Sequence, residues 1–143
     1  MDWYWLYFNY EGRLNRLPHF LYNLLVAAPS FALSIITVET GFGSGPDLVF
    51  RIIMQLAQWI LFLMSVMLSV KRLHDLGYSG KWLLCPILFS FVFNWLPFPV
   101  NEGLTLAIGA SILVFYSFLL LWRGTVGPNR FGPDPLAQRV SPE

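Results

Sequence analysis

The sequence predicts an all-α membrane protein, a four-helix transmembrane bundle whose two termini lie in the cytoplasm. The first observation is composition: 56% of the 143 residues are hydrophobic and 12% are charged, whereas a soluble domain carries about 25% charged residues. The second is a set of four long apolar stretches. The third is a strong bias of Lys and Arg to one side of those stretches. A soluble fold of this length could not bury so much apolar surface.

The N-terminal segment is the first element, and it is unusually aromatic. Residues 3–10 read WYWLYFNY, with six aromatic side chains in eight positions and no charge. Aromatic side chains favour the boundary between water and lipid. We therefore expect this segment to lie flat at the cytoplasmic headgroups, and an arm that docks a partner protein is the alternative.

Four apolar stretches follow, at about residues 19–38, 52–70, 82–100 and 104–122, and none contains Asp, Glu, Lys or Arg. A bilayer core of about 30 Å requires roughly 20 residues at about 1.5 Å each. Each stretch must be helical, because lipid offers no partner for backbone N–H and C=O groups. Pumps and proton-coupled carriers usually place an ionisable group at depth, so the absence of Asp, Glu, Lys and Arg speaks against that kind of function.

The orientation follows from the distribution of basic residues. Eight Lys and Arg side chains fall on one side of the four stretches, and only Arg51 falls on the other. Because cytoplasmic segments retain positive charge, we expect both termini, the central loop and the tail at residues 123–143 to be cytoplasmic. The eight are Arg13, Arg16, Lys71, Arg72, Lys81, Arg123, Arg130 and Arg139.

Several classes of function find no support in the composition. The net charge of +1 provides no field that would attract nucleic acid. The single cysteine, Cys85, excludes an internal disulfide. His19, His74 and Cys85 are not spaced as a pair of metal ligands. We therefore expect no metal, no other cofactor and no nucleic-acid partner.

Three polar motifs adjoin the stretches on the side expected to be cytoplasmic. They read EGRLNR at residues 11–16, KRLHDLGYSGKW at 71–82 and GPNRFGPDP at 127–135. In the central motif, the second helix is predicted to continue to about Leu76 with Gly77 as its C-terminal cap. Arg72 and Asp75 would then be neighbours three residues apart on one face. Lys71 and Arg72 would also suit the negative end of their own helix dipole.

We expect the three motifs to meet and form a polar belt at the cytoplasmic end of the bundle. In one interpretation the polar belt is a structural clasp, with Arg130 reaching Asp75 or a helix C-terminus. In another it contacts anionic lipid headgroups or a partner protein. The residues of the polar belt are Arg13, Arg16, Arg72, His74, Asp75, Asn129, Arg130 and Asp134.

Polar residues within the stretches are few. Gln58 and Asn94 are among the strongest. They could line a narrow path through the membrane or form hydrogen bonds between helices.

The order of the motifs resembles that of the DUF805 family, small bacterial inner-membrane proteins of the YhaH-like kind. The resemblance covers nearly the whole chain. It rests on the aromatic start, on Gly12, Arg13 and Arg16, and on two longer motifs. Matching residues in those two are Arg72, Leu73, His74, Asp75, Gly77, Ser79 and Gly80, then Asn129, Arg130, Gly132, Asp134 and Pro135. The family implies a location in the bacterial inner membrane and supplies no activity.

Three hypotheses for function follow. The first is a non-enzymatic membrane protein of one domain, residues 1–143, that serves as an accessory or structural component of an inner-membrane assembly or of a homo-oligomer. The second is a channel or transporter oligomer with a polar path near Asn94 and Gln58. The third is a membrane enzyme that uses His74 and Asp75 as a general acid–base pair; no nucleophile or cofactor motif accompanies that pair.

Overall fold

The structure is a computed structural model that describes residues 2–39, 48–88 and 102–137. Within these ranges the chain is helical and contains no β-strand. The elements are α1 (Trp3–Phe8), α2 (Arg16–Glu39), α3 (Leu48–Asp75), the 3₁₀ helix η1 (Gly80–Leu83) and α5 (Glu102–Leu121).

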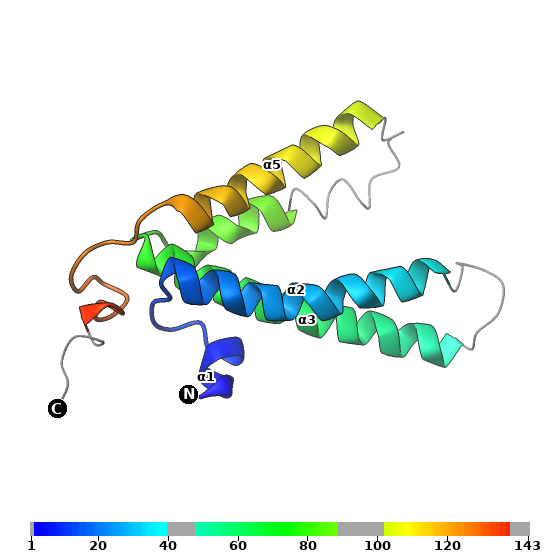
Figure 1. Cartoon of the computed structure of the whole chain (residues 1–143), viewed down its shortest axis with the longest axis horizontal. Coiled ribbons are helices and arrows are strands. Elements are labelled where there is room, and N and C mark those ends of the chain that lie inside the picture. The colour runs from blue at the N-terminus through cyan, green and yellow to red at the C-terminus, as the bar shows by residue number, and fades with distance from the viewer. Residues whose placement is uncertain (1, 40–47, 89–101, 138–143) are drawn as a thin grey trace.

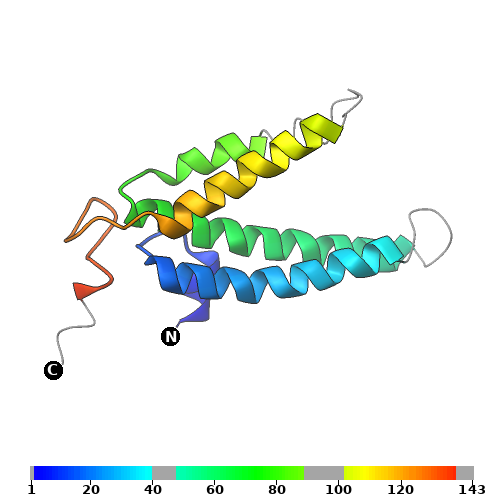
Figure 2. The ribbon, with the colours of Figure 1, turned by 45° about the horizontal axis from the view of Figure 1, so that its top comes forward.

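Three long helices dominate the architecture. α2 and α3 run side by side along most of their lengths, and α5 contacts both (Figure 1). α5 approaches this pair at its C-terminal end and diverges from it toward its N-terminal end in both ribbon views (Figure 2). α1 packs against α3 near the start of α2. The tail that follows α5 lies at the same end of the molecule.

The helices match the predicted stretches where the structure describes them. α2 covers residues 19–38, α3 covers 52–70, and α5 covers nearly all of 104–122. The third stretch begins in η1 and is helical over residues 84–88, and its remainder lies outside the described residues. Two described segments, Arg16–Ile36 and Leu48–Asp75, are long and apolar enough to cross a membrane.

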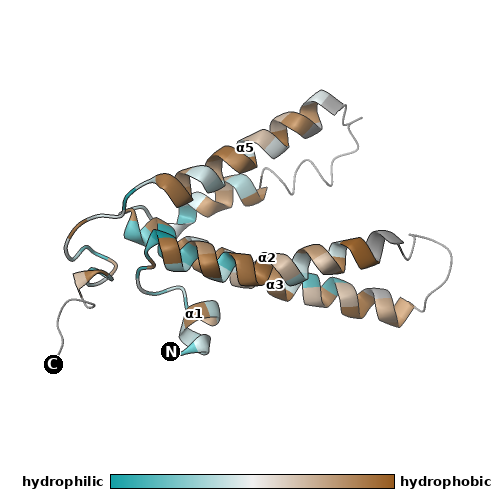
Figure 3. Cartoon of the chain, in the orientation of Figure 1, coloured by the Kyte–Doolittle hydropathy of each residue, from teal (hydrophilic) through white to brown (hydrophobic). Residues whose placement is uncertain are grey.

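The buried core sits at one end of the molecule. One cluster joins Leu6, Leu14 and Leu68, and a second joins Leu73 and Leu119. Figure 3 shows hydrophilic residues concentrated at this same end, where α2 begins and α3 ends. Elsewhere the long helices leave most of their apolar side chains uncovered by protein. The best-packed region of the chain therefore also holds its polar motifs.

Gly77 ends α3, as the sequence predicts. Its φ of +85° lies in the left-handed region that favours glycine. The N–H of Gly77 donates to the carbonyl of His74 at 3.1 Å, and the N–H of Tyr78 donates to that of Leu73 at 2.9 Å. These two bonds form a Schellman cap. The last helical residue is Asp75, one residue before the predicted end.

Replacing Gly77 tests this cap. Gly77→Ala should lower the apparent melting temperature in detergent, because a side chain costs about 1–2 kcal/mol in the left-handed region. Gly109→Ala is the matched control, since Gly109 lies within α5 and a Cβ there meets no atom within 4 Å. The control should melt no lower than wild type. Equal effects of the two substitutions would contradict the role of the cap.

Candidate functional site

Asp75 is the centre of the polar belt. It is the last residue of α3 and is 3% exposed. Its Oδ1 accepts from the Nε of Arg13 at 3.2 Å and from the Nη2 of Arg13 at 3.1 Å. Its Oδ2 accepts from the Nη1 of Arg72, three residues earlier on the same helix. One buried carboxylate is therefore shared by two buried guanidinium groups.

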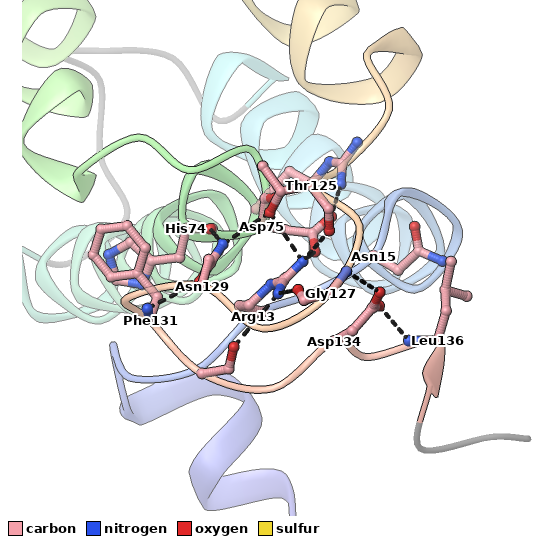
Figure 4. A network of polar contacts seen from close by, with 12 residues as sticks. Arg13, Asn15, His74, Asp75, Thr125, Gly127, Asn129, Phe131, Asp134 and Leu136 are labelled. Carbon is pink, nitrogen blue, oxygen red and sulfur yellow. Dashed lines mark hydrogen bonds and ion pairs between the residues drawn. The ribbon is translucent and has the colours of Figure 1, made fainter. Parts of the chain in front are cut away.

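Arg13 connects this carboxylate to the tail (Figure 4). Its guanidinium donates to the carbonyl oxygens of Thr125 and Gly127, the latter at 2.6 Å. The tail also donates to α3, through a hydrogen bond of 2.8 Å from the N–H of Thr125 to the carbonyl of Asp75. The segment before α2, the end of α3 and the tail are thus joined at a single point.

Lys71 and Arg72 satisfy the C-terminal ends of other helices. Lys71 donates to the carbonyls of Trp5 and Leu6 in α1, and its Nζ lies 3.8 Å from the centre of the Trp5 ring. The Nε of Arg72 donates to the carbonyl of Leu119 at 2.7 Å, and its Nη2 donates to that of Trp122. Carbonyls in a last helical turn lack intrahelical partners and carry partial negative charge. The two cations therefore fasten α1 and α5 to α3, in addition to any effect on their own helix.

His74 is held on three sides. Its ring stacks on Phe131, with the ring centres 4.0 Å apart and the planes within 5°. Its Nδ1 lies 3.2 Å from the carbonyl oxygen of Gly12, which can only accept a hydrogen bond. Its own carbonyl accepts from the Nδ2 of Asn129 at 2.9 Å. The Oδ1 of Asn129 in turn accepts from the N–H of Phe131. His74 and Asn129 therefore dock the tail onto α3.

Arg130 and Asp134 act at the periphery of the polar belt. The Nη2 of Arg130 donates to the carbonyl of Gly77 at 3.1 Å, so Arg130 meets the C-terminal end of α3 and not Asp75. Asp134 accepts from the backbone N–H of Gly127 at 2.8 Å and from that of Leu136 at 2.9 Å. These two donors hold the pKa of Asp134 below its usual value, chiefly through the Leu136 N–H. Asp134 thereby closes the turn of the tail.

Arg16 is the one residue of the predicted polar belt whose side chain takes no part in these contacts. It is exposed, and across residues 2–39, 48–88 and 102–137 its guanidinium makes no hydrogen bond or ion pair. The structure therefore brings together seven of the eight predicted residues and leaves the exposed Arg16 outside their contacts.

Of the two polar residues singled out in the apolar stretches, the structure describes Gln58. The Nε2 of Gln58 donates to the hydroxyl of Ser30 at 2.6 Å and so bridges α3 to α2. The hydroxyl of Ser65 likewise donates to the Oδ1 of Asn23 at 2.8 Å between the same two helices. Asn94 lies outside the described residues. Gln58 therefore forms an inter-helix hydrogen bond, one of its two predicted uses.

Sequence reasoning missed two members of the site. Thr125 binds both Arg13 and Asp75, and its only sequence signal is that it is the first hydroxyl residue after the fourth stretch. Gly124 leaves room for the Asp75 carboxylate, because a Cβ on Gly124 would stand 2.0 Å from Oδ2. As for metal ions, no three His, Cys, Asp or Glu side chains gather in the part of the chain that the structure describes.

The comparisons with known proteins agree with the motif pattern. The family model described as "Protein of unknown function (DUF805)" matches residues 7–133, a range that contains the first two polar motifs and residues 127–133 of the third. The chain belongs to the DUF805 family. No solved structure matches the chain.

Two relatives of this DUF805 protein come from Escherichia coli K12. The chain is 27% identical to "Inner membrane protein YhaI" over 139 residues, which cover 94% of this chain and 96% of the relative. It is 28% identical to "Inner membrane protein YhaH" over 144 residues, which cover 94% and 97%. Both relatives therefore align with the chain over almost its full length.

Neutralising Asp75 tests the centre of the polar belt. Asp75→Asn should lower the apparent melting temperature strongly, because it leaves two guanidiniums buried without a counter-charge and turns an amide NH₂ toward one of them. Removing one partner of a buried ion pair costs roughly 3–5 kcal/mol. The control is Lys81→Gln, which removes an exposed charge outside these contacts and should change stability by less than about 0.5 kcal/mol.

A double-mutant cycle separates the ion pair from general damage. Arg13→Gln combined with Asp75→Asn should cost less than the sum of the two single changes, because the double variant removes one charge of each sign. Contacting charges of this kind couple by about 0.5–3 kcal/mol. Strictly additive losses in thermal melting would show that Arg13 and Asp75 do not depend on each other.

Proposed function

We propose that this chain is a multi-pass protein of the bacterial inner membrane with both termini in the cytoplasm. Two apolar helices of membrane-spanning length support the proposal. So does the exposure of large apolar side chains along three helices, for example Leu24 at 53%, Leu56 at 57% and Leu113 at 68%. Water would oppose such a surface and lipid would favour it. Both relatives are named as inner-membrane proteins.

The proposed role within that membrane is non-enzymatic, as a structural or accessory component of an assembly or of a homo-oligomer. The observation that carries this proposal is that the Asp75 carboxylate is fully engaged by hydrogen bonds within the fold. Both of its oxygens accept from guanidinium groups, and the His74 ring lies stacked under Phe131. A general acid–base pair needs a face open to substrate. These ionisable groups instead hold the helix ends in register.

The conducting alternative rests on a polar path that includes Gln58. In the structure the Gln58 amide is bonded to Ser30, which favours packing between α2 and α3 over a wetted path. Polar side chains commonly bridge membrane helices in this way. The structural role therefore fits the described helices better than conduction does.

Cysteine labelling tests the topology. In a Cys85→Ala background, Glu11→Cys, Lys81→Cys and Val126→Cys should react with an impermeant maleimide only after the inner membrane is opened. Ser44→Cys, in the loop expected to face outward, should react in intact cells. The physical reason is the retention of basic segments on the cytoplasmic side. Labelling of positions 81 and 126 from opposite sides would overturn the topology.

The assembly state tests the role. Extracted from its native host in mild detergent, the 16.4 kDa chain should run with a mass above that of one protomer. The added mass should be further copies or a partner in fixed ratio, identified by mass spectrometry. Liposomes that contain the purified protein should show no ion flux above empty liposomes. A bare monomer would count against the assembly role, and flux would favour the conducting alternative.

A further inference from the structure

A cleft of about 670 Å³ opens beside the polar belt, between the start of α2 and the segment that follows α5. Its volume lies within the range of about 300–1,000 Å³ that is typical of ligand sites. Figure 4 shows Asn15, Asp75, Thr125 and Asp134 around this region. Residues 15–16, 123–126 and 134–137 form its walls together with Asp75.

Two arginines in the cleft have guanidinium groups without a hydrogen bond or ion pair among the described residues. Arg16 and Arg123 are both exposed, and both line the cleft. Neither side chain makes a hydrogen bond or an ion pair with any other described residue. Arg13 and Arg72 differ sharply, since their donors are taken by Asp75 and by backbone carbonyls. The cleft therefore presents donors that the fold itself does not use.

Among the described residues, neither carboxylate in the cleft forms an ion pair with Arg16 or Arg123. Asp75 is already shared by Arg13 and Arg72. Asp134 accepts backbone N–H bonds at both of its oxygens.

The charge behind the wall of the cleft is also positive. Asp75, in the wall of the cleft, is flanked by the buried guanidiniums of Arg13 and Arg72. α2 begins at Arg16, so the positive end of its dipole lies at the same place. Four arginines stand at or beside the cleft against two carboxylates, so the local field favours an anion; they are Arg13, Arg16, Arg72 and Arg123 against Asp75 and Asp134.

We propose that this cleft binds a phosphate group, with Arg16 and Arg123 as its guanidinium ligands. Arginine forks match phosphate oxygens, and a guanidinium loses less hydration than an ammonium on binding. The phosphate is carried by an anionic lipid headgroup or is free in solution. The lipid source rests on the proposed membrane location, because it requires the polar belt to lie at the headgroups, where basic clefts between helices bind anionic lipids.

The experiment uses the full-length protein purified in a neutral detergent. The ligands are phosphatidylglycerol, phosphatidylcholine and inorganic phosphate, each added at constant ionic strength held by chloride. The readouts are the apparent melting temperature and the lipid retained in native mass spectrometry. The variants are Arg16→Gln, Arg123→Gln and the double change. The control is Lys81→Gln, which removes one exposed cation outside the cleft.

Phosphatidylglycerol should raise the melting temperature of wild type and of Lys81→Gln, and phosphatidylcholine should not. Each cleft variant should require about tenfold more phosphatidylglycerol, since one charge-assisted contact is lost. Protection by inorganic phosphate alone would support the site and identify free phosphate as the ligand. The proposal is overturned if phosphatidylglycerol raises the melting temperature of the double variant as much as that of wild type. It is also overturned if Lys81→Gln loses as much of this rise as the cleft variants do, or if chloride raises the melting temperature as much as phosphate does.

A charge-preserving pair keeps the test interpretable if the double Gln variant folds poorly. Arg16→Lys with Arg123→Lys retains both charges but loses the fork geometry. It should bind phosphatidylglycerol more weakly than wild type and melt like wild type without lipid, and full wild-type binding would contradict recognition by guanidinium forks. Because the phosphate arm needs neither a bilayer nor a partner, its result is independent of the cysteine labelling and of the assembly mass.

Discussion

The ion pairs of Asp75 with Arg13 and Arg72 are the interaction on which the rest of this end of the molecule depends. Removing charges from water costs several kcal/mol per ion, and attraction recovers this cost only when geometry and further hydrogen bonds are good. One carboxylate cannot satisfy two guanidiniums. Their remaining donors go to carbonyls of the tail and of α5. The segment before α2, the end of α3 and the tail are therefore stable only together.

The ends of the helices explain why so many cations are needed here. α1, α3 and α5 all bring C-terminal ends to this region, and each end presents unpaired carbonyls and partial negative charge. Lys71 meets α1, Arg72 meets α5 and Arg130 meets the cap of α3. Without these donors, neighbouring dipole ends of like sign would repel. The basic residues from which the sequence analysis predicts the orientation thus also allow the C-terminal ends of three helices to pack together.

Much of the fold follows from the sequence, and less of the site does. Apolar length locates the described parts of the long helices, and Gly77 fixes the end of α3 to within one residue. The spacing of Arg72 and Asp75 is local, so their pairing follows from helical geometry alone. The partners that these side chains find far away in the chain cannot be predicted from the sequence in this way. Whether Arg13 or Arg130 reaches Asp75 depends on the path of the tail, and that path depends on the close approach permitted by Gly124.

The motif before α2 contains both kinds of arginine that this protein uses. Arg13 and Arg16 stand three residues apart, yet Arg13 is buried with its donors taken, whereas Arg16 is exposed with its donors unused. A structural arginine is one whose hydrogen bonds are completed by the fold. An arginine whose donors are left unpaired at a cleft keeps its electrostatic attraction for an anion. What separates the arginines of the polar belt from those of the cleft is therefore whether their N–H donors are already paired. Residue type alone does not reveal this property.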